Sequence, residues 1–207
     1  MAVGNNSNAS FYNISNGKIC RQFQSATPES KERVNKNGKT VHEMFYDFID
    51  GTIVSIETKE SEYGKSWLIT LDDGESKQVL QMPFSSGYSS AFLKMLPNVD
   101  LLSPVKIIPK LVIEGDKKKT SLFVTQYGSP LKHYYTKDRP NGLPQMKQVK
   151  IKGKMTWDDS EMMEFFENMV KTDVVPNLPK GGNRVAVTVH DAVEVGGETN
   201  EADDLAF

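Results

Sequence analysis

The chain has 207 residues, a formal net charge of −2 and a single cysteine, Cys20. One cysteine excludes an intramolecular disulfide framework and a cysteine zinc site, and it favours a reducing compartment. No stretch reaches the roughly 18 apolar residues that a membrane span needs, and no apolar secretory segment opens the chain. We therefore expect a cytoplasmic protein with no membrane partner.

The small net charge conceals two segments of opposite sign. Residues 1–155 contain 22 Lys and Arg against 15 Asp and Glu, whereas residues 156–207 contain 3 against 12. A basic body predicts a polyanionic partner, and an acidic end can compete for the same surface. Both charge sets could instead be ordinary solvated surface.

The N-terminal part predicts a β extension. Residues 1–10 offer almost nothing to bury, so we expect them to be disordered. Residues 19–23 alternate as a short strand does. Asn37-Gly38 lies between two strand-like pieces and predicts a β-hairpin, because both residues tolerate positive φ.

The segment from 47 to 127 organises the chain. It contains five strand-like runs, with one helix-like run, 88–96, between the third and the fourth. Ser86 and its neighbours can cap this helix, and Pro97 can end it. Three strands, a helix and two strands form the order of the OB-fold, a five-stranded barrel that holds oligonucleotides. The strand-like runs are residues 50–57, 67–71, 77–82, 105–113 and 120–127.

We therefore predict a mostly β protein whose core, 47–127, is a closed five-stranded OB-fold barrel. In its fourth strand, Lys106 and Lys110 should point outward. The alternate positions should face the core: Val105, Ile107, Pro109, Leu111 and Ile113.

The C-terminal part predicts additions to the barrel, so that one domain spans 11–190. Residues 129–155 form a basic connector whose prolines argue against a helix. Residues 157–171 have apolar positions at helical spacing and predict a helix. Residues 184–190 read as one more strand, and 191–207 as a disordered acidic tail.

Catalytic patterns are weak. The three histidines lie far apart, and the chain lacks a glycine-rich phosphate loop. The densest carboxylates, Asp158, Asp159 and Glu161, are explained by favourable charge at a helix N-terminus. We therefore predict a noncatalytic protein with no cofactor and no metal site.

Binding of single strands fits the sequence better, because it needs cations for phosphates and aromatic faces for unstacked bases. In an OB-fold the site crosses the second and third strands and is flanked by two loops, here 59–65 and 115–119. The cationic candidates are Lys59, Lys65, Lys77, Lys106, Lys110, Lys117, Lys118, Lys119, Lys132 and Arg139. The aromatic candidates are Tyr63, Trp67, Phe84, Tyr88, Phe123, Tyr127, Tyr134 and Tyr135.

Several candidates have a structural alternative. Trp67 alternates with Ile69 and Leu71, so it could equally belong to the core. Phe123 and Tyr127 could pack under the C-terminal helix, and residues 117–119 could be a solvated turn.

The last seven residues, 201–207, are acidic and then apolar, ending on phenylalanine. With the predicted barrel, they make the chain resemble the single-stranded DNA-binding proteins of bacteriophages. The resemblance implies that the protein coats exposed strands in DNA replication, recombination and repair, in the host cytoplasm if it is phage-encoded. It also implies a tail that occupies the DNA site weakly when DNA is absent, and that docks partner proteins through Asp203, Asp204, Leu205 and Phe207.

The match is incomplete, because Ala206 stands where the bacterial proteins usually have proline. The partner's identity and the oligomeric state, including a homo-oligomer, therefore stay open. An RNA-binding OB-fold protein and a noncatalytic protein-interaction or assembly module remain alternatives.

Overall fold

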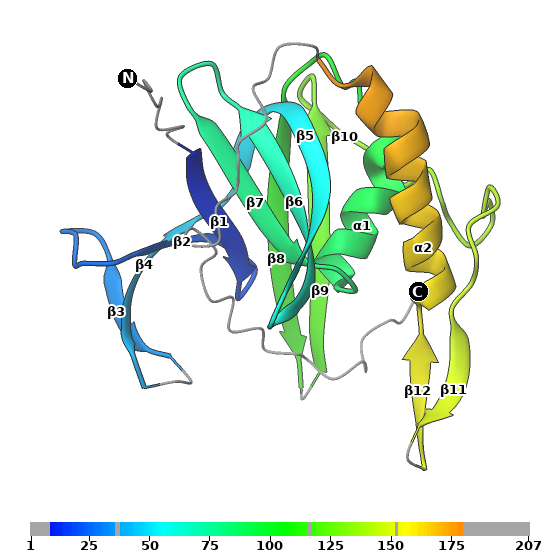
Figure 1. Cartoon of the computed structure of the whole chain (residues 1–207), viewed down its shortest axis with the longest axis horizontal. Helices are drawn as coiled ribbons and strands as arrows, with labels where there is room; N and C mark the ends of the chain where they lie inside the picture. The colour runs from blue at the N-terminus through cyan, green and yellow to red at the C-terminus, as the bar shows by residue number, and fades with distance from the viewer. Residues whose placement is uncertain (1–8, 36–37, 116, 152, 180–207) are drawn as a thin grey trace, which may run out of the picture.

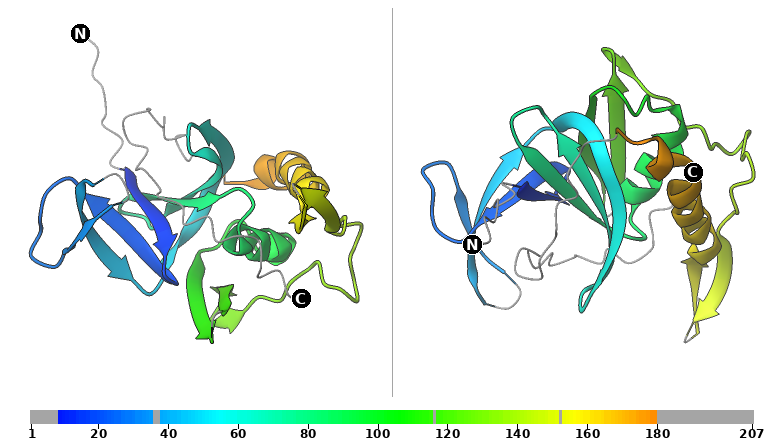
Figure 2. Two further views of the ribbon diagram at one scale, coloured as in Figure 1. Left: turned by 90° about the horizontal axis from the view of Figure 1, so that it is seen from below. Right: turned by 45° about the horizontal axis from the view of Figure 1, so that its top comes forward.

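The computed structural model describes residues 9–35, 38–115, 117–151 and 153–179. The strand predicted over 184–190, the tail over 191–207 and most of the predicted N-terminal disorder lie outside the described residues. The described part is mostly β, as predicted, with one large sheet, a separate two-stranded sheet and helices α1 and α2 (Figures 1 and 2). None of its helices has the length and apolar character needed to cross a membrane.

The large sheet has ten strands in an open order. From one edge to the other they are β10 (Ser129–Pro130), β9 (Lys117–Gln126), β8 (Val105–Glu114), β5 (Ile49–Ser61), β6 (Gly64–Asp72), β7 (Lys77–Pro83), β1 (Ala9–Ser15), β2 (Lys18–Phe23), β4 (Thr40–Tyr46) and β3 (Lys31–Val34).

The predicted order of elements is confirmed for the central segment, where β5, β6 and β7 precede α1 (Gly87–Met95) and β8 and β9 follow it. The long strand β5 serves two neighbours. Its first residues pair with β8 up to Gly51, and from Thr52 onward it pairs with β6. Gly51 has φ +149°, and a Cβ there would lie 2.9 Å from the Asp72 carbonyl oxygen, so only glycine fits this bend.

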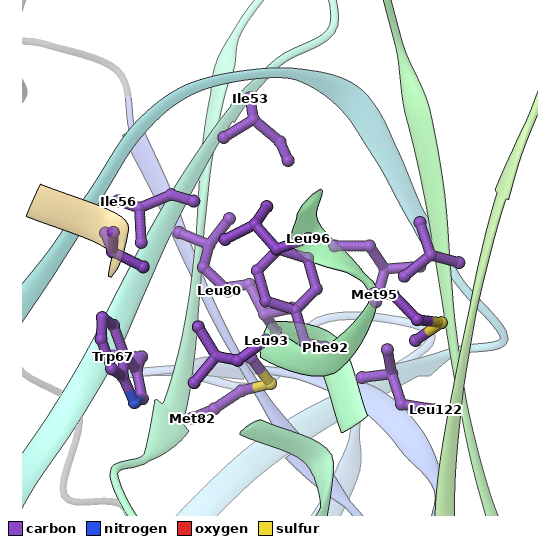
Figure 3. Close-up of a cluster of buried hydrophobic side chains, with 14 of the residues drawn as sticks. Ile53, Ile56, Trp67, Leu80, Met82, Phe92, Leu93, Met95, Leu96 and Leu122 are labelled. Carbon is purple, nitrogen blue, oxygen red and sulfur yellow. The ribbon is translucent and has the colours of Figure 1, made fainter. Parts of the chain in front are cut away.

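The predicted closed barrel was wrong, because β7 and β9 do not pair in the described sheet. Helix α1 contacts both strands and lies between them. Its apolar side, with Phe92 1% exposed, fills the space that a fifth strand pairing would close. Figure 3 shows the Phe92 ring at the centre of the core, with Leu80 of the sheet on one side and Leu122 on the other.

The start of α1 forms as predicted. Ser86 is its N-cap residue, and the Ser89 backbone N–H donates to the Ser86 hydroxyl oxygen at 3.1 Å. This bond satisfies one of the amide donors that a helix N-terminus leaves free. The helix ends at Met95 and continues as the short 3₁₀ turn η1 (Leu96–Asn98), which contains Pro97.

The predicted N-terminal hairpin is confirmed as β3 and β4, and the predicted short strand is β2. The boundary of the predicted disorder was wrong, because Ala9 and Ser10 belong to β1 and pair in parallel with β7. Backbone pairing with β7 holds these two small residues, so composition alone did not reveal their place in the strand. Gly17, in the β1–β2 turn, has φ +71° and brings the extension against the backbone of β8 at Leu111.

The C-terminal part differs from the prediction in the basic connector and at both ends of the helix. The basic connector ends in a hairpin, β11 (Lys147–Ile151) and β12 (Lys154–Asp158), so α2 (Ser160–Met169) begins later than predicted. A π turn, η2 (Val170–Val174), and a 3₁₀ turn, η3 (Val175–Asn177), continue α2. The predicted apolar face of α2 is confirmed as buried: Met162, Met163, Phe166, Met169 and Val170.

The predicted core face of β8 is only partly right. Val105, Ile107 and Pro109 are buried, but Leu111 is half-buried and Ile113 is 65% exposed. The last residues of β8 and the first residues of β9 extend beyond the core. Side chains on both faces of the hairpin are therefore exposed there, and strand parity no longer separates core from solvent.

Candidate nucleic-acid interface

The β8–β9 hairpin carries a row of apolar side chains on the side that faces away from the core. Ile108 pairs with Phe123, and Phe48 precedes Ile49, whose partner is Ile107. Phe48 is therefore opposite Ile108, and the side chains of Phe48, Ile108 and Phe123 lie side by side on three neighbouring stretches of chain. Phe48 is 43% exposed and Phe123 49% exposed. Because large apolar side chains are rarely left open in a group, this row marks a candidate contact site.

Lysines border this row on both strands. In β8, Lys106 and Lys110 lie on either side of Ile108, and in β9 Lys117 and Lys119 share the side of Phe123. The Lys106 ammonium lies 4.0 Å from the centre of the Phe48 ring, a cation–π contact. We call this surface the outer hairpin face, and it consists of Phe48, Lys106, Ile108, Lys110, Val112, Glu114, Lys117, Lys119 and Phe123.

Three carboxylates lie near the outer hairpin face, and one of them, Glu114, is on the face itself, opposite Lys117 in the strand register. Asp50 is opposite Lys106 in the strand register. The Lys18 ammonium donates a hydrogen bond to the Asp47 carboxylate, and this ion pair holds the pKa of the Asp47 carboxyl below its usual range. Within the described residues, Lys106 and Lys110 form no ion pair. Lys106 lies over the Phe48 ring, and the charge of Lys110 contributes to the lowered pKa of the Asp47 carboxyl.

The structure brings five of the predicted residues together on this face: Lys106, Lys110, Lys117, Lys119 and Phe123. Phe48 and Ile108 were missed. The apolar residues at both parities within 44–51 predict a strand covered on both faces, but Phe48 is exposed. The signal that could have found Phe48 is its parity, opposite to that of the buried Ile49.

A second group of predicted residues lies where the β5–β6 hairpin meets the end of β7. Trp67 was predicted to stack on bases or to be core, and it is core, at 1% exposure. Phe84 stacks on it, with ring centroids 5.3 Å apart and planes 12° apart. An indole enclosed in this way cannot receive a base, so its assignment as a binding residue was wrong.

Lys65 belongs to the same group, and protein groups surround its ammonium. It lies 4.3 Å from the Phe84 ring centre and 2.7 Å from a carboxylate oxygen of Glu167 on α2. The ammonium of Lys59 is buried and has no hydrogen-bond partner within the described structure. Tyr63, in the turn, is 57% exposed. Of this group, Tyr63 alone presents a wide surface to solvent.

The basic connector runs over the helices. Tyr135 was predicted to bind DNA, but it is 5% exposed and packs edge-on against Phe165 and Phe166 of α2, so this prediction was wrong. Tyr134 remains 42% exposed, and its backbone N–H donates to the Lys94 carbonyl of α1. Lys132 and Arg139 are exposed on this connector. Lys132 follows Leu131, whose backbone N–H donates to the Val124 carbonyl of β9 at 2.8 Å, so Lys132 lies beside the β9 edge of the sheet.

The remaining candidates are dispersed. Lys77 begins β7, opposite Asp72 and at the far end of that strand from Phe84. The Tyr88 hydroxyl donates to the Lys110 carbonyl at 3.3 Å, which ties α1 to β8. Tyr127 follows β9 and is 75% exposed, with its hydroxyl held by Asp100 and Ser103. Lys118 lies on the opposite side of β9 from Lys117 and Lys119.

No family model, curated protein or solved structure matches this chain. The assignment of a function therefore depends on the chemistry of the site. In the part of the chain that the structure describes, no group of three or more His, Cys, Asp or Glu residues could hold a metal ion. What the outer hairpin face offers is positive charge interleaved with apolar and aromatic surface, the combination that binds unpaired nucleotides.

Proposed function

We propose that this protein is a noncatalytic OB-fold protein that binds single-stranded DNA with little sequence preference. The observation that carries the proposal is the outer hairpin face, where Phe48 and Phe123 lie open between lysines. Aromatic faces stack on any base, and lysines neutralise phosphates without reading sequence. Such a face has the chemistry to coat a strand rather than to select a site.

The strand pairing supports an OB-fold core. An OB-fold of five strands in the order 1-2-3-5-4-1 needs five pairings to close. With β5, β6, β7, β8 and β9 taken as strands 1 to 5, the described sheet contains four of these pairings. They are β5 with β6, β6 with β7, β5 with β8, and β8 with β9. The missing pairing, between β7 and β9, is the place where α1 lies. We interpret the core as an OB-fold left open at this position.

The biological role follows from the resemblance of the sequence to phage single-stranded DNA-binding proteins. We propose that the protein covers single strands during DNA replication, recombination and repair in the cytoplasm, which is the host cytoplasm if the protein is phage-encoded. Its acidic end, with Asp203, Asp204, Leu205 and Phe207, would recruit replication or recombination proteins. The single strand itself is the primary partner.

The proposal is tested by fluorescence anisotropy of a labelled oligo-dT titrated with the full-length protein across a salt series. We expect affinity to fall steeply with salt, because each phosphate contact contributes about 0.7 to the logarithmic slope for single strands. Oligo-dC should bind with similar affinity, since stacking tolerates any base. Duplex DNA should bind more weakly, because its bases are already stacked.

Two results would overturn this proposal. Equal or tighter binding of an RNA of the same length would favour an RNA-binding protein. No binding to any nucleic acid at low salt would favour a protein-interaction or assembly module. Measuring oligo-dT, oligo-dC, duplex DNA and the RNA in the same buffer separates these outcomes.

A further inference from the structure

The β11–β12 hairpin stands apart from the rest of the described fold. Its two strands form their own sheet and pair only with each other among the described strands, with a turn at Gly153. Figure 1 shows the hairpin projecting beyond the N-terminal end of α2. A lone two-stranded ribbon buries little apolar surface and is marginally stable by itself. We call this hairpin the arm.

One side of the arm combines apolar and aromatic surface with a cation. Gln148 pairs with Trp157, and Lys150 pairs with Met155, so these four side chains lie on the same side. Met155 is 60% exposed. Trp157 is half-buried and is not part of the core cluster formed by the described residues. The chain has only two tryptophans, and the other, Trp67, is enclosed in the core.

The charges of the arm favour an anionic partner. Within its described residues it carries Lys147, Lys150 and Lys154 against Asp158 alone. Asp158 is occupied, because the Ser160 hydroxyl donates to it at 2.5 Å and the Ser160 backbone N–H at 3.0 Å, and these two bonds lower the pKa of its carboxyl. Lys150 and Lys154 form no ion pair within the described residues.

The arm is held in place at its base. Lys147 is ion-paired with Glu161 in the first turn of α2, and α2 packs on the core through Phe166. In Figure 1, the arm, the tip of the β8–β9 hairpin and the β5–β6 turn all lie on the lower side of the view. A single strand bound at the outer hairpin face would have to extend beyond this face to contact the arm as well, so only a longer oligonucleotide could occupy both.

We propose that the arm is a second contact for single-stranded nucleic acid, in which Trp157 stacks on a base and Lys150, on the same side of the arm, contacts a flanking phosphate. This inference rests on the proposed function and extends it. A short oligonucleotide would fill only the outer hairpin face, whereas a longer one would also engage the arm. Affinity should therefore increase with length in two stages, and only the second stage should involve Trp157.

The test uses the full-length protein and oligo-dT of increasing length, with anisotropy to report binding and tryptophan emission to report the arm. Long oligo-dT should quench the emission. Trp157→Phe should abolish most of this quenching while nearly preserving affinity, because phenylalanine still stacks. Trp157→Ala should weaken binding of long oligo-dT about tenfold, which is the effect of losing one stacked base, and leave short oligo-dT unaffected. Thr156→Ala, on the other side of the arm, is the matched control and should change neither signal.

The outcomes separate this inference from the proposed function. If oligo-dT binds by anisotropy but leaves tryptophan emission unchanged, and Trp157→Ala binds all lengths normally, the arm is not a contact and the proposed function stands. If the wild-type protein binds no oligonucleotide, both proposals fail. If Trp157→Ala abolishes a concentration-dependent increase in molecular mass without changing DNA affinity, the arm joins copies of the chain and the inference is overturned.

Discussion

Two regions of the molecule both place lysines next to aromatic rings, but they differ in how far these side chains are exposed to solvent. Where β5–β6 meets the end of β7, Trp67 is enclosed and Lys65 is ion-paired with Glu167. On the outer hairpin face, Phe48 and Phe123 are each more than two-fifths exposed, and Lys106 lies over the Phe48 ring. The first region encloses its aromatic ring and pairs Lys65 within the protein, whereas the second leaves its aromatic rings partly exposed to solvent.

Helix α2 accounts for much of this difference. Glu167 receives a hydrogen bond from Thr58 at 3.3 Å as well as the Lys65 contact, so it joins α2 to both strands of the β5–β6 hairpin. The outer hairpin face has no such neighbour among the described elements. Composition alone cannot distinguish the two regions, because the distinction depends on what packs against each.

The largest effect should come from Trp67. Replacing it with alanine removes a large buried ring and leaves Phe84 without its stacking partner. We expect Trp67→Ala to lower the free energy of unfolding by about 3–5 kcal/mol, measured by urea denaturation. The fraction that remains folded should bind oligo-dT with wild-type affinity. Normal stability with weakened binding would reverse our assignment of this region as core.

Phe123 should behave in the opposite way. We expect Phe123→Ala to reduce the affinity for oligo-dT by about 1–3 kcal/mol, the contribution of one stacked base. The free energy of unfolding should change by less than about 0.5 kcal/mol, because the ring is half exposed. The comparison variant is Tyr63→Ala, at the exposed β5–β6 turn. An equal loss of affinity in both variants would show that the two regions contribute alike.

The lysines of the outer hairpin face should affect the salt dependence more than the affinity at one salt concentration. We expect the double variant Lys106→Ala and Lys110→Ala to make the logarithmic salt slope shallower by about 1.4, or about 0.7 for each lost phosphate contact. Lys31 and Lys39, exposed near the β3–β4 hairpin, provide a charge-matched control pair. A slope that both double variants change equally would indicate a diffuse charge effect without a defined face.

Much of the fold was predictable because its signals are local. The alternation of apolar and polar residues, together with the turn residues, predicted every strand of the central segment. Ser86 indicated the start of α1. Closure was not predictable, because it depends on whether β7 reaches β9 or α1 lies between them, and no residue in either strand encodes that choice. The start of β1 was missed for a related reason, since Ala9 and Ser10 are held inside the sheet by backbone pairing with β7.

The candidate site was less predictable than the fold. Lys106, Lys110 and Phe123 were identified because strand parity places a side chain on one face or the other. Parity does not say which face of a sheet a helix will cover. Trp67 and Tyr135 were therefore misassigned, because residues distant in sequence pack around each of them. Phe48 was missed because no such residue covers its side of the sheet.

The smallest effect should come from Glu167. Its hydrogen bond with Lys65 holds the pKa of the Glu167 carboxyl below its usual value. A carboxyl whose pKa is lowered by folding stabilises the folded state above its unfolded pKa of about 4.3, and this contribution is lost as the pH falls through the folded pKa. We expect Glu167→Gln to lower the free energy of unfolding by about 1 kcal/mol at pH 7. The difference from wild type should shrink as the pH is lowered below about 4. Glu164→Gln, an exposed change on the same helix, should show neither effect. If Glu167→Gln also tightened binding of oligo-dT, the released Lys65 would be contacting phosphate, and the contrast between the two regions would then depend on this one carboxylate.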